Sequence, residues 1–142
     1  MSREIKFRGK LHDEDRWVYG YYAKTVVNDG IPFCLEDCRI HNIIIENGTM
    51  WFAIPETVGE YTGLRDCKGQ EVYEGDIVET VYDGILRIYV VVFDLEELGF
   101  KATNGKENYG NNFQYLTCCE EVTIIGNIHD SPELLKGGIP NE

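Results

Sequence analysis

Residues 58–78 of this chain read Val58-Gly-Glu-Tyr-Thr-Gly-Leu-Arg-Asp-Cys-Lys-Gly-Gln-Glu-Val-Tyr-Glu-Gly-Asp-Ile-Val78. Asp66 and Gly69 occupy the first and fourth positions of a type I turn pattern, and Gly75 permits a second bend. The residues around these turns are rich in β-branched and aromatic side chains, which favour strands. The stretch therefore predicts a joint at which an N-terminal part passes into a second set of strands, and it displays no catalytic motif.

Strand signals extend through most of the chain. Asn47-Gly48 and Asp83-Gly84 each lie between runs of β-branched and aromatic residues, a pattern that predicts tight hairpin turns. Near the end, Asp130–Leu135 predicts a short helix, because Ser131 can cap it and Pro132 suits its first turn. The predicted strands cover, in chain order, residues 5–8, 17–22, 31–35, 43–46, 49–54, 57–62, 71–82, 85–93, 98–103, 113–117 and 121–128.

This pattern predicts a mainly β protein built from two packed parts. An N-terminal β-rich part (residues 1–56) leads into a connector with one strand (residues 57–71). About five short strands in hairpin succession then predict an SH3-like barrel or roll, which ends in the one short helix (residues 72–135). Residues 136–142 form a predicted tail. We expect the N-terminal part to pack on the barrel, since no Gly/Ser-rich linker separates them.

The charge balance limits the partners that the chain can have. The chain has 142 residues and a net charge of −12, which argues against direct binding of duplex nucleic acid. Residues 55–97 hold eleven acids against three bases, whereas residues 1–10 hold four bases against one acid. Such asymmetry is typical of a solvated surface. It also allows a basic protein partner, or head-to-middle self-association into a homo-oligomer.

Hydropathy and cysteine usage predict the compartment. No apolar run approaches the roughly 18 residues of a membrane helix, and Met1 is not followed by an apolar leader. The five cysteines are odd in number and two of them are adjacent, which does not suit a disulfide framework. We therefore expect a cytoplasmic protein of a bacterial host, with no membrane partner.

Five segments carry a resemblance to a known family. They are Ile5–Lys10, Trp17–Gly20, Val58–Leu64, Tyr73–Val78 and Ile125–Leu135. In this order they resemble the successive motifs of the YopX family, and they span nearly the whole chain. The resemblance implies a small protein of phages and prophages, with a mainly β fold that includes an SH3-like barrel. It supplies neither an activity nor catalytic residues. The acidic tract 13–15 and the cysteines at 34, 38, 118 and 119 match none of these motifs.

The Tyr73–Val78 segment contains a carboxylate pair, Glu74 and Asp76. Together with a histidine, such a pair could bind a metal or perform acid–base chemistry, as in a small hydrolase-like enzyme. The local sequence favours a structural role, because Gly75 permits a bend and Asp76 can accept hydrogen bonds from nearby amides. An acidic nucleic-acid mimic is a further alternative. It requires one face to present Glu71, Glu74, Asp76 and Glu79.

Aromatic residues offer a second candidate site, formed by Trp17, Tyr19, Tyr21, Tyr61 and Tyr73. If they share a solvent-facing sheet surface, they could bind a peptide or unstacked bases. The commoner role of such residues is to bury their rings in a core or between two parts. The acidic composition favours a protein over bases as the partner.

The cysteines and histidines suggest only half of a metal site. Cys34, Cys38 and His41 have usable spacing, with Cys67 as a conceivable fourth ligand. Structural zinc usually uses two short paired knuckles, so buried cysteines beside a surface histidine are the favoured interpretation. If residues 118 and 119 lie on a strand, their cysteine side chains point to opposite faces. The histidines at 12, 41 and 129 accompany no nucleophile motif, and no glycine-rich phosphate loop occurs.

The sequence therefore predicts an accessory protein that acts by binding a protein partner or itself, rather than an enzyme. We predict no metal and no cofactor. The predicted binding residues are Trp17, Tyr19, Tyr61, Tyr73, Glu74 and Asp76.

Overall fold

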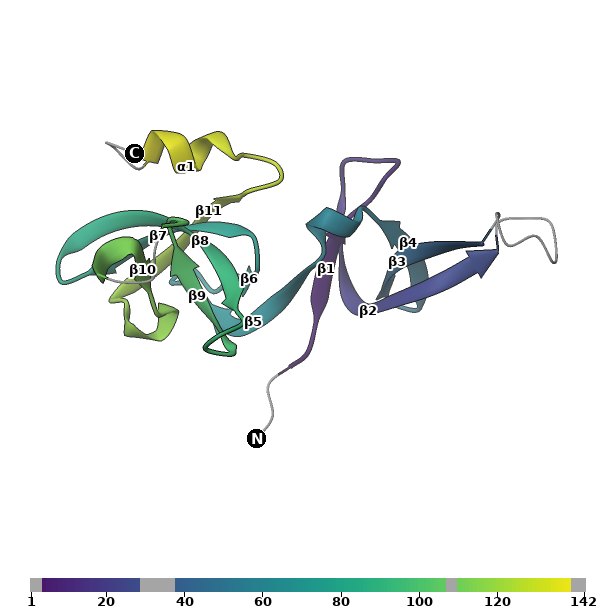
Figure 1. The fold of residues 1–142 in the computed structure, drawn as a ribbon, viewed down its shortest axis with the longest axis horizontal. Coiled ribbons are helices and arrows are strands. Elements are labelled where there is room, and N and C mark those ends of the chain that lie inside the picture. The colour runs from purple at the N-terminus through teal and green to yellow at the C-terminus, as the bar shows by residue number, and fades with distance from the viewer. Residues whose placement is uncertain (1–3, 29–37, 107–109, 139–142) are drawn as a thin grey trace. The chain divides into compact units, whose positions relative to one another are not determined.

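A computed structural model describes residues 4–28, 38–106 and 110–138, with side chains placed for residues 4–25, 41–106 and 110–135. The chain divides into two compact units, residues Met1–Glu60 and Tyr61–Glu142. Antiparallel strands build both units, so the predicted mainly β fold is confirmed (Figure 1). The boundary lies inside the stretch 57–71 that the sequence predicts as a connector.

The N-terminal unit contains an antiparallel sheet in the order β4-β3-β2-β1. Its strands are β1 (Phe7–Lys10), β2 (Trp17–Asn28), β3 (Cys38–Glu46) and β4 (Thr49–Ala53). Asn47 and Gly48 join β3 to β4 with φ of 51° and 84°, the positive values of a primed turn. Both predicted hairpins of this unit are confirmed. The predicted strand 31–35 lies outside the described residues.

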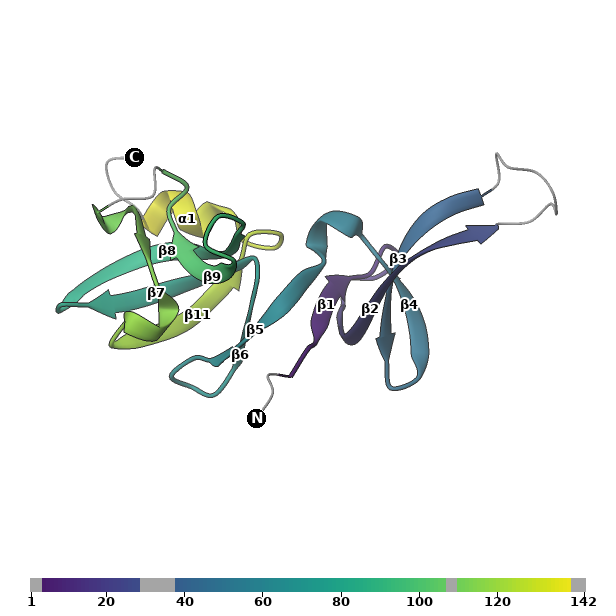
Figure 2. The same cartoon turned by 60° about the horizontal axis from the view of Figure 1, so that its bottom comes forward.

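Strands β2 and β3 are longer than the sequence predicts. Their pairing runs from Tyr21↔Ile45 to Asn28↔Cys38, whereas β4 reaches only as far as the pair Asn42↔Ala53. Beyond β4 they therefore continue as a two-stranded ribbon (Figure 2).

One face of this sheet carries the core of the N-terminal unit. Its buried members are Leu11, Val18, Ile44 and Ala53, and the half-buried residues packed around them are Phe7, Tyr22, Trp51 and Val58. Strand alternation explains the set, because residues 18 and 22 of β2 lie on the same face as residue 44 of β3. The sheet is tight at Gly20, where an added Cβ would lie 1.9 Å from the Ile45 carbonyl oxygen. Glycine is required at that position.

The C-terminal unit contains a five-stranded antiparallel sheet in the order β10-β9-β8-β7-β11. Its strands are β7 (Asp76–Tyr82), β8 (Ile85–Asp94), β9 (Gly99–Thr103), β10 (Phe113–Gln114) and β11 (Glu121–Asn127). Asp83 and Gly84 join β7 to β8 with φ of 55° and 74°, which confirms the predicted hairpin. The finer description of residues 72–135 as an SH3-like barrel stays a prediction.

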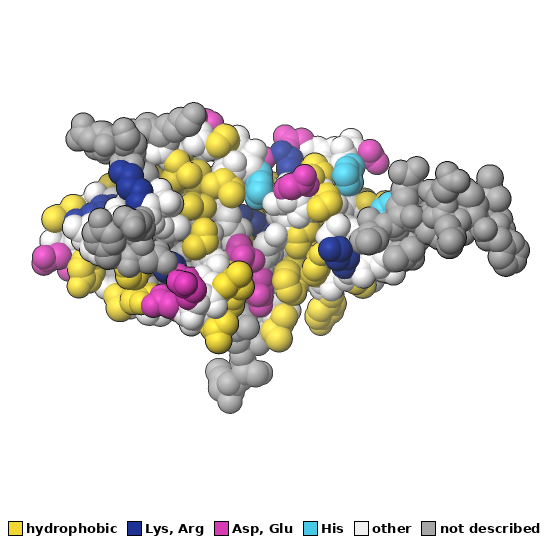
Figure 3. All heavy atoms as spheres, in the orientation of Figure 1, with side chains coloured by type: hydrophobic (Ala, Val, Ile, Leu, Met, Phe, Trp, Pro, Cys, Tyr) yellow, Lys and Arg dark blue, Asp and Glu magenta, His cyan; other side chains and the backbone are white. Residues whose placement is uncertain are grey.

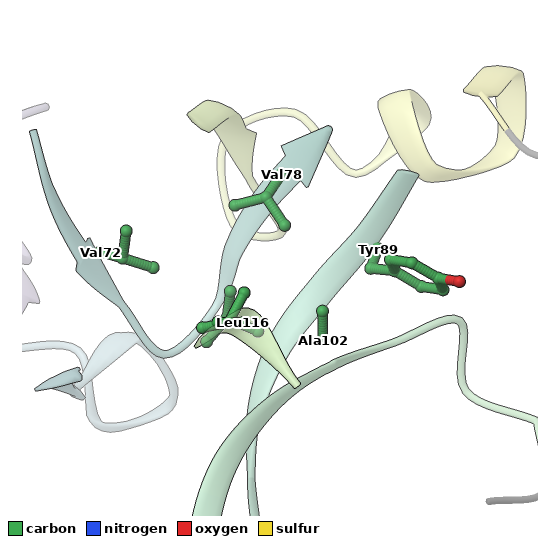
Figure 4. Packing of buried hydrophobic residues seen from close by; sticks show 6 residues of the cluster. Val72, Val78, Tyr89, Ala102 and Leu116 are labelled. Atoms are coloured by element: carbon green, nitrogen blue, oxygen red, sulfur yellow. The ribbon is translucent and has the colours of Figure 1, made fainter. Parts of the chain in front are cut away.

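A second hairpin covers the core of this unit. Strand β5 (Gly59–Arg65) pairs with β1 through its first two residues, and from Tyr61 onward it pairs with β6 (Glu71–Tyr73). Figure 4 shows Val72 of β6 pointing toward a cluster from the sheet. The buried members of that cluster are Val72, Val78, Tyr89, Val91, Ala102 and Leu116.

Three elements differ from the sequence prediction. The predicted strand 71–82 is interrupted between β6 and β7, because Gly75 turns the chain with φ of 90°. The predicted strand 113–117 pairs through two residues only, after which a 3-10 turn, Leu116–Cys118, directs Leu116 into the core. The helix α1 spans Glu133–Gly138 and packs on β8. Among the described residues, no helix has the length and apolar character needed to cross a membrane.

Candidate functional site

The six predicted binding residues divide between the two units. Trp17 and Tyr19 belong to β2 of the N-terminal unit, whereas Tyr61, Tyr73, Glu74 and Asp76 belong to the C-terminal unit. The two groups therefore have to be considered as separate candidate sites.

The Glu74-Gly75-Asp76 bend has a structural role in the C-terminal unit. Asp76 is 2% exposed, and its Oδ2 accepts a hydrogen bond from the Tyr73 backbone N–H at 2.8 Å. The Gly75 N–H donates to the Val91 carbonyl at 2.8 Å, and the Gly75 carbonyl accepts from the Ile128 N–H at 2.9 Å. The bend thus ties β6 to β8 and to the end of β11. A buried carboxylate engaged in this way is not presented to a substrate.

The burial of Asp76 also argues against the two alternative functions, a nucleic-acid mimic and a hydrolase-like enzyme. With Asp76 buried, the four acids proposed for a nucleic-acid mimic do not form an exposed row. Glu71 is itself engaged, because it accepts a hydrogen bond from the Tyr73 hydroxyl at 2.9 Å and lies 3.4 Å from Arg65 Nη2. Within the described residues, no three His, Cys, Asp or Glu side chains are grouped to hold a metal.

Tyr61 and Tyr73 lie inside the C-terminal unit. They are 5% and 2% exposed, and their ring centroids are 5.5 Å apart across the β5–β6 pair. Their contribution is packing, with the Tyr73 hydroxyl satisfied by Glu71. For these two members of the aromatic set, the rings are buried, which is the role that the sequence favours.

Asp66 is a buried acid that the sequence predicts only as a turn residue. Its Oδ1 accepts the backbone N–H groups of Lys68 and Gln70 at 2.9 and 2.8 Å, and its Oδ2 accepts that of Ile124 at 3.1 Å. Burial favours the neutral acid, but the three amide donors and the nearby Lys68 outweigh it and lower the pKa of Asp66. This carboxylate fastens the β5–β6 hairpin to β11, beside a second bond from the Cys67 N–H to the Val122 carbonyl.

The cysteine half-site is only partly described. Cys34 and the side chain of Cys38 lie outside the described residues. Cys67 is exposed, and its Sγ lies 3.2 Å from Thr123 Oγ1. Cys119 is half-buried and donates to Gln114 Oε1 at 3.4 Å, and burial raises the pKa of its thiol. Cys118 ends the 3-10 turn Leu116–Cys118 and Cys119 caps it, so the strand geometry expected for these two residues does not apply.

The N-terminal unit presents the clearest candidate surface. Tyr21 of β2, Ile45 of β3 and Met50 of β4 lie directly opposite one another across the sheet, and Phe52 lies two pairs further along on the same face. Tyr21 is 71% exposed, Met50 68% and Phe52 50%. We define the apolar face as Tyr19, Tyr21, Ile45, Met50 and Phe52. It lies opposite the face that carries the core, so this sheet is apolar on both sides.

A hollow of about 450 Å³ opens on the apolar face. Ile5 and Lys6 before β1, Tyr19 and Tyr21 of β2, and Ile45 of β3 contribute to its lining. Next to it, Trp17 is half-buried beneath the Arg8 guanidinium, whose Cζ lies 4.7 Å from the ring centroid. Figure 3 shows hydrophobic side chains (yellow) at the surface over the strands of this unit. Such an arrangement can bind an apolar surface of another protein.

Sequence reasoning found part of this surface and missed the rest. The sequence pattern indicates Tyr19 and Tyr21 as candidates, whereas it places Ile45, Met50 and Phe52 only in a hairpin. A signal was present: residues 43–45 read Ile-Ile-Ile and residues 50–52 read Met-Trp-Phe. Three consecutive apolar residues on a strand place apolar side chains on both faces of the sheet.

Comparisons with known proteins agree with the resemblance seen in the motifs. A family model described as YopX protein matches residues 6–136. A solved structure, that of protein EF1440 from Enterococcus faecalis, superposes with a TM-score of 0.54 over 94% of this chain and 99% of that chain. Its sequence is 21% identical, so the likeness concerns the fold alone. No curated protein sequence matches this chain.

Proposed function

This chain belongs to the YopX protein family, and from that premise we propose that it is an accessory protein of phages and prophages that acts by binding. Its partner is another protein or a second copy of the chain, and the contact is made through the apolar face of the N-terminal unit. The observation that carries this proposal is the exposure of Tyr21, Met50 and Phe52 on one side of an antiparallel sheet.

Burial of this face in a complex has a clear driving force. Exposed apolar surface gains roughly 25 cal/mol for each Å² removed from water, and grouped apolar side chains on a soluble protein commonly mark interaction sites. Tyrosine, phenylalanine and methionine are among the residues enriched at protein interfaces. The hairpin turn at Asn47-Gly48 and the pairing with β3 fix the backbone at Met50 and Phe52, so little backbone entropy is lost on binding.

No observation favours the hydrolase-like alternative. Asp76 is buried and bonded to a backbone amide, and the exposed part of the apolar face carries no carboxylate–histidine pair among the residues that define it. The acidic composition further supports a protein partner over nucleic acid.

Site-specific photo-crosslinking in host cells that carry the phage tests the proposal. A crosslinker at Tyr21 should capture one discrete protein, or a second copy of the chain, and the substitution Phe52→Glu should abolish that product by placing a charge in the contact. Tyr82, which is 45% exposed in the C-terminal unit, provides the matched control position. The proposal is wrong if both positions give the same products, or if Phe52→Glu leaves the Tyr21 product unchanged.

A further inference from the structure

A second hollow lies beside the apolar face, between β4 and the turn that joins β1 to β2. Leu11 forms an isolated bridge with Ala53, so the chain starts to run antiparallel to β4. It then turns back, because the Leu11 N–H donates to the Arg16 carbonyl at 3.1 Å. Residues 12–14 consequently leave β4 unpaired on that side, and a hollow of about 240 Å³ remains between them and residues 50–52.

The lining of this hollow combines acids with aromatic and thioether groups. Leu11, His12, Asp13 and Glu14 come from the end of β1 and the turn, and Met50, Trp51 and Phe52 come from β4. A carboxylate next to an aromatic ring is the environment that stabilises an ammonium or guanidinium group, through ion pairing and attraction to the ring face. Met50 and Phe52 also belong to the apolar face, so the two surfaces are continuous.

The chain itself shows how a cation is accommodated here. Arg16 places its Cζ 4.4 Å from the centroid of the Trp51 ring, with Nε 3.3 Å from Glu14 Oε1 and Nη1 3.5 Å from Glu46 Oε1. This internal cation leaves negative charge in excess at the turn. Lys10 lies 2.8 Å from Asp15, whereas Asp13 forms no ion pair with any of the described residues.

We propose that this hollow receives a lysine or arginine side chain of the protein partner, and that flanking apolar residues of the same segment lie on Met50 and Phe52. The proposal rests on the proposed function and adds the chemistry of the partner: a segment that combines basic and apolar residues. The net charge of −12 favours such a partner, because long-range attraction to a basic segment speeds encounter and like charge rejects acidic ones.

Titration of the full chain with defined peptides tests the inference. The probe is a short capped peptide in which lysine alternates with valine, and its analogue carries glutamine in place of lysine. Binding is followed by NMR at the Trp51 indole N–H. The lysine peptide should shift that signal, and its affinity should fall as salt is added. Asp13→Asn combined with Glu14→Gln should weaken its binding by about five-fold, as expected for the loss of two exposed ion pairs. Glu56→Gln, at an exposed acid of the same unit, should leave binding unchanged.

Each outcome separates this inference from the proposed function. Equal binding of both peptides, or an unchanged affinity in the double variant, overturns the cation site. Failure of the lysine peptide to shift the Trp51 signal at millimolar concentration also overturns it. In all of these cases the crosslinking result at Tyr21 still decides whether the apolar face binds a protein. Because Glu14 contacts Arg16, the single variant Asp13→Asn serves as a second test that leaves the internal contacts intact.

Discussion

Removal of the Asp66 carboxylate should weaken the attachment of the β5–β6 hairpin to β11 and so destabilise the C-terminal unit. Asp66 is 6% exposed and accepts three backbone N–H groups, two from its own turn and one from Ile124, which is 58 residues away in sequence. Asp66→Asn keeps one carbonyl oxygen, which can still serve Lys68 and Gln70. Its amide nitrogen then faces the Ile124 N–H, so a charge-assisted bond is lost and two donors oppose each other.

The cost can be worked from these contacts. A hydrogen bond to a charged group contributes about 1.5–3 kcal/mol, and a buried donor left without a partner adds to the loss. We therefore expect Asp66→Asn to lower the free energy of unfolding by about 2–3 kcal/mol. With a urea m-value of roughly 1–3 kcal/mol/M, the midpoint should fall by about 1–2 M. Asp83→Asn is the matched control, because Asp83 is exposed and its φ of 55° suits asparagine.

The pH dependence supplies an independent check. The pKa of Asp66 is lowered in the folded protein, so its stabilising effect is fully present above the pKa of the unfolded chain, roughly pH 4. It is lost as the pH falls through the lower, folded pKa. The gap in urea midpoint between the parent and Asp66→Asn should therefore be constant at neutral pH and should narrow below about pH 4. A variant as stable as Asp83→Asn at pH 7, or a gap that does not change with pH, would refute this role of Asp66.

Two further predictions follow from close contacts. Gly20→Ala should lower the free energy of unfolding by about 1–3 kcal/mol or more, because its Cβ would lie 1.9 Å from the Ile45 carbonyl oxygen. Gly99→Ala, whose Cβ would meet no atom closer than 3.9 Å, should change the urea midpoint little, and equal effects would contradict the prediction. Cys119 should react with iodoacetamide at pH 8 more slowly than its exposed neighbour, because burial raises the pKa of its thiol and its Sγ donates to Gln114. Equal rates, measured in single Cys→Ser variants by mass spectrometry, would argue against this environment.

Local turn chemistry explains why much of the fold could be predicted. Asn47-Gly48 and Asp83-Gly84 adopt positive φ at both positions, as their residue types require, and each sets the register of a hairpin. The Asp66 turn also forms as predicted, with the Gly69 N–H donating to the Asp66 carbonyl at 2.9 Å. In each case the determining residues are neighbours in sequence, so the pattern is visible without the fold.

Contacts between distant residues could not be predicted in this way. The bond from Ile124 to Asp66 depends on β11 passing beside a turn 58 residues earlier, and no local pattern indicates it. The early end of β10 has the same origin, since Leu116 leaves the strand to fill a core built by β6 to β9. Asp76 illustrates the converse. The sequence predicts that its carboxylate accepts a hydrogen bond from a nearby backbone amide, and the Tyr73 N–H is that donor.

The apolar face shows why a binding surface is harder to recognise from sequence than a core. Consecutive apolar residues in β3 and β4 satisfy two demands at once, because Ile44 and Trp51 pack with the core while Ile45, Met50 and Phe52 lie on the opposite side. A sheet with both faces apolar normally requires a covering layer on each. On this opposite side Ile43 is buried, but Met50 and Phe52 stay 68% and 50% exposed. A partner that supplies the missing layer would remove this surface from water, and a basic residue in that partner would meet Asp13 and Glu14 at its edge.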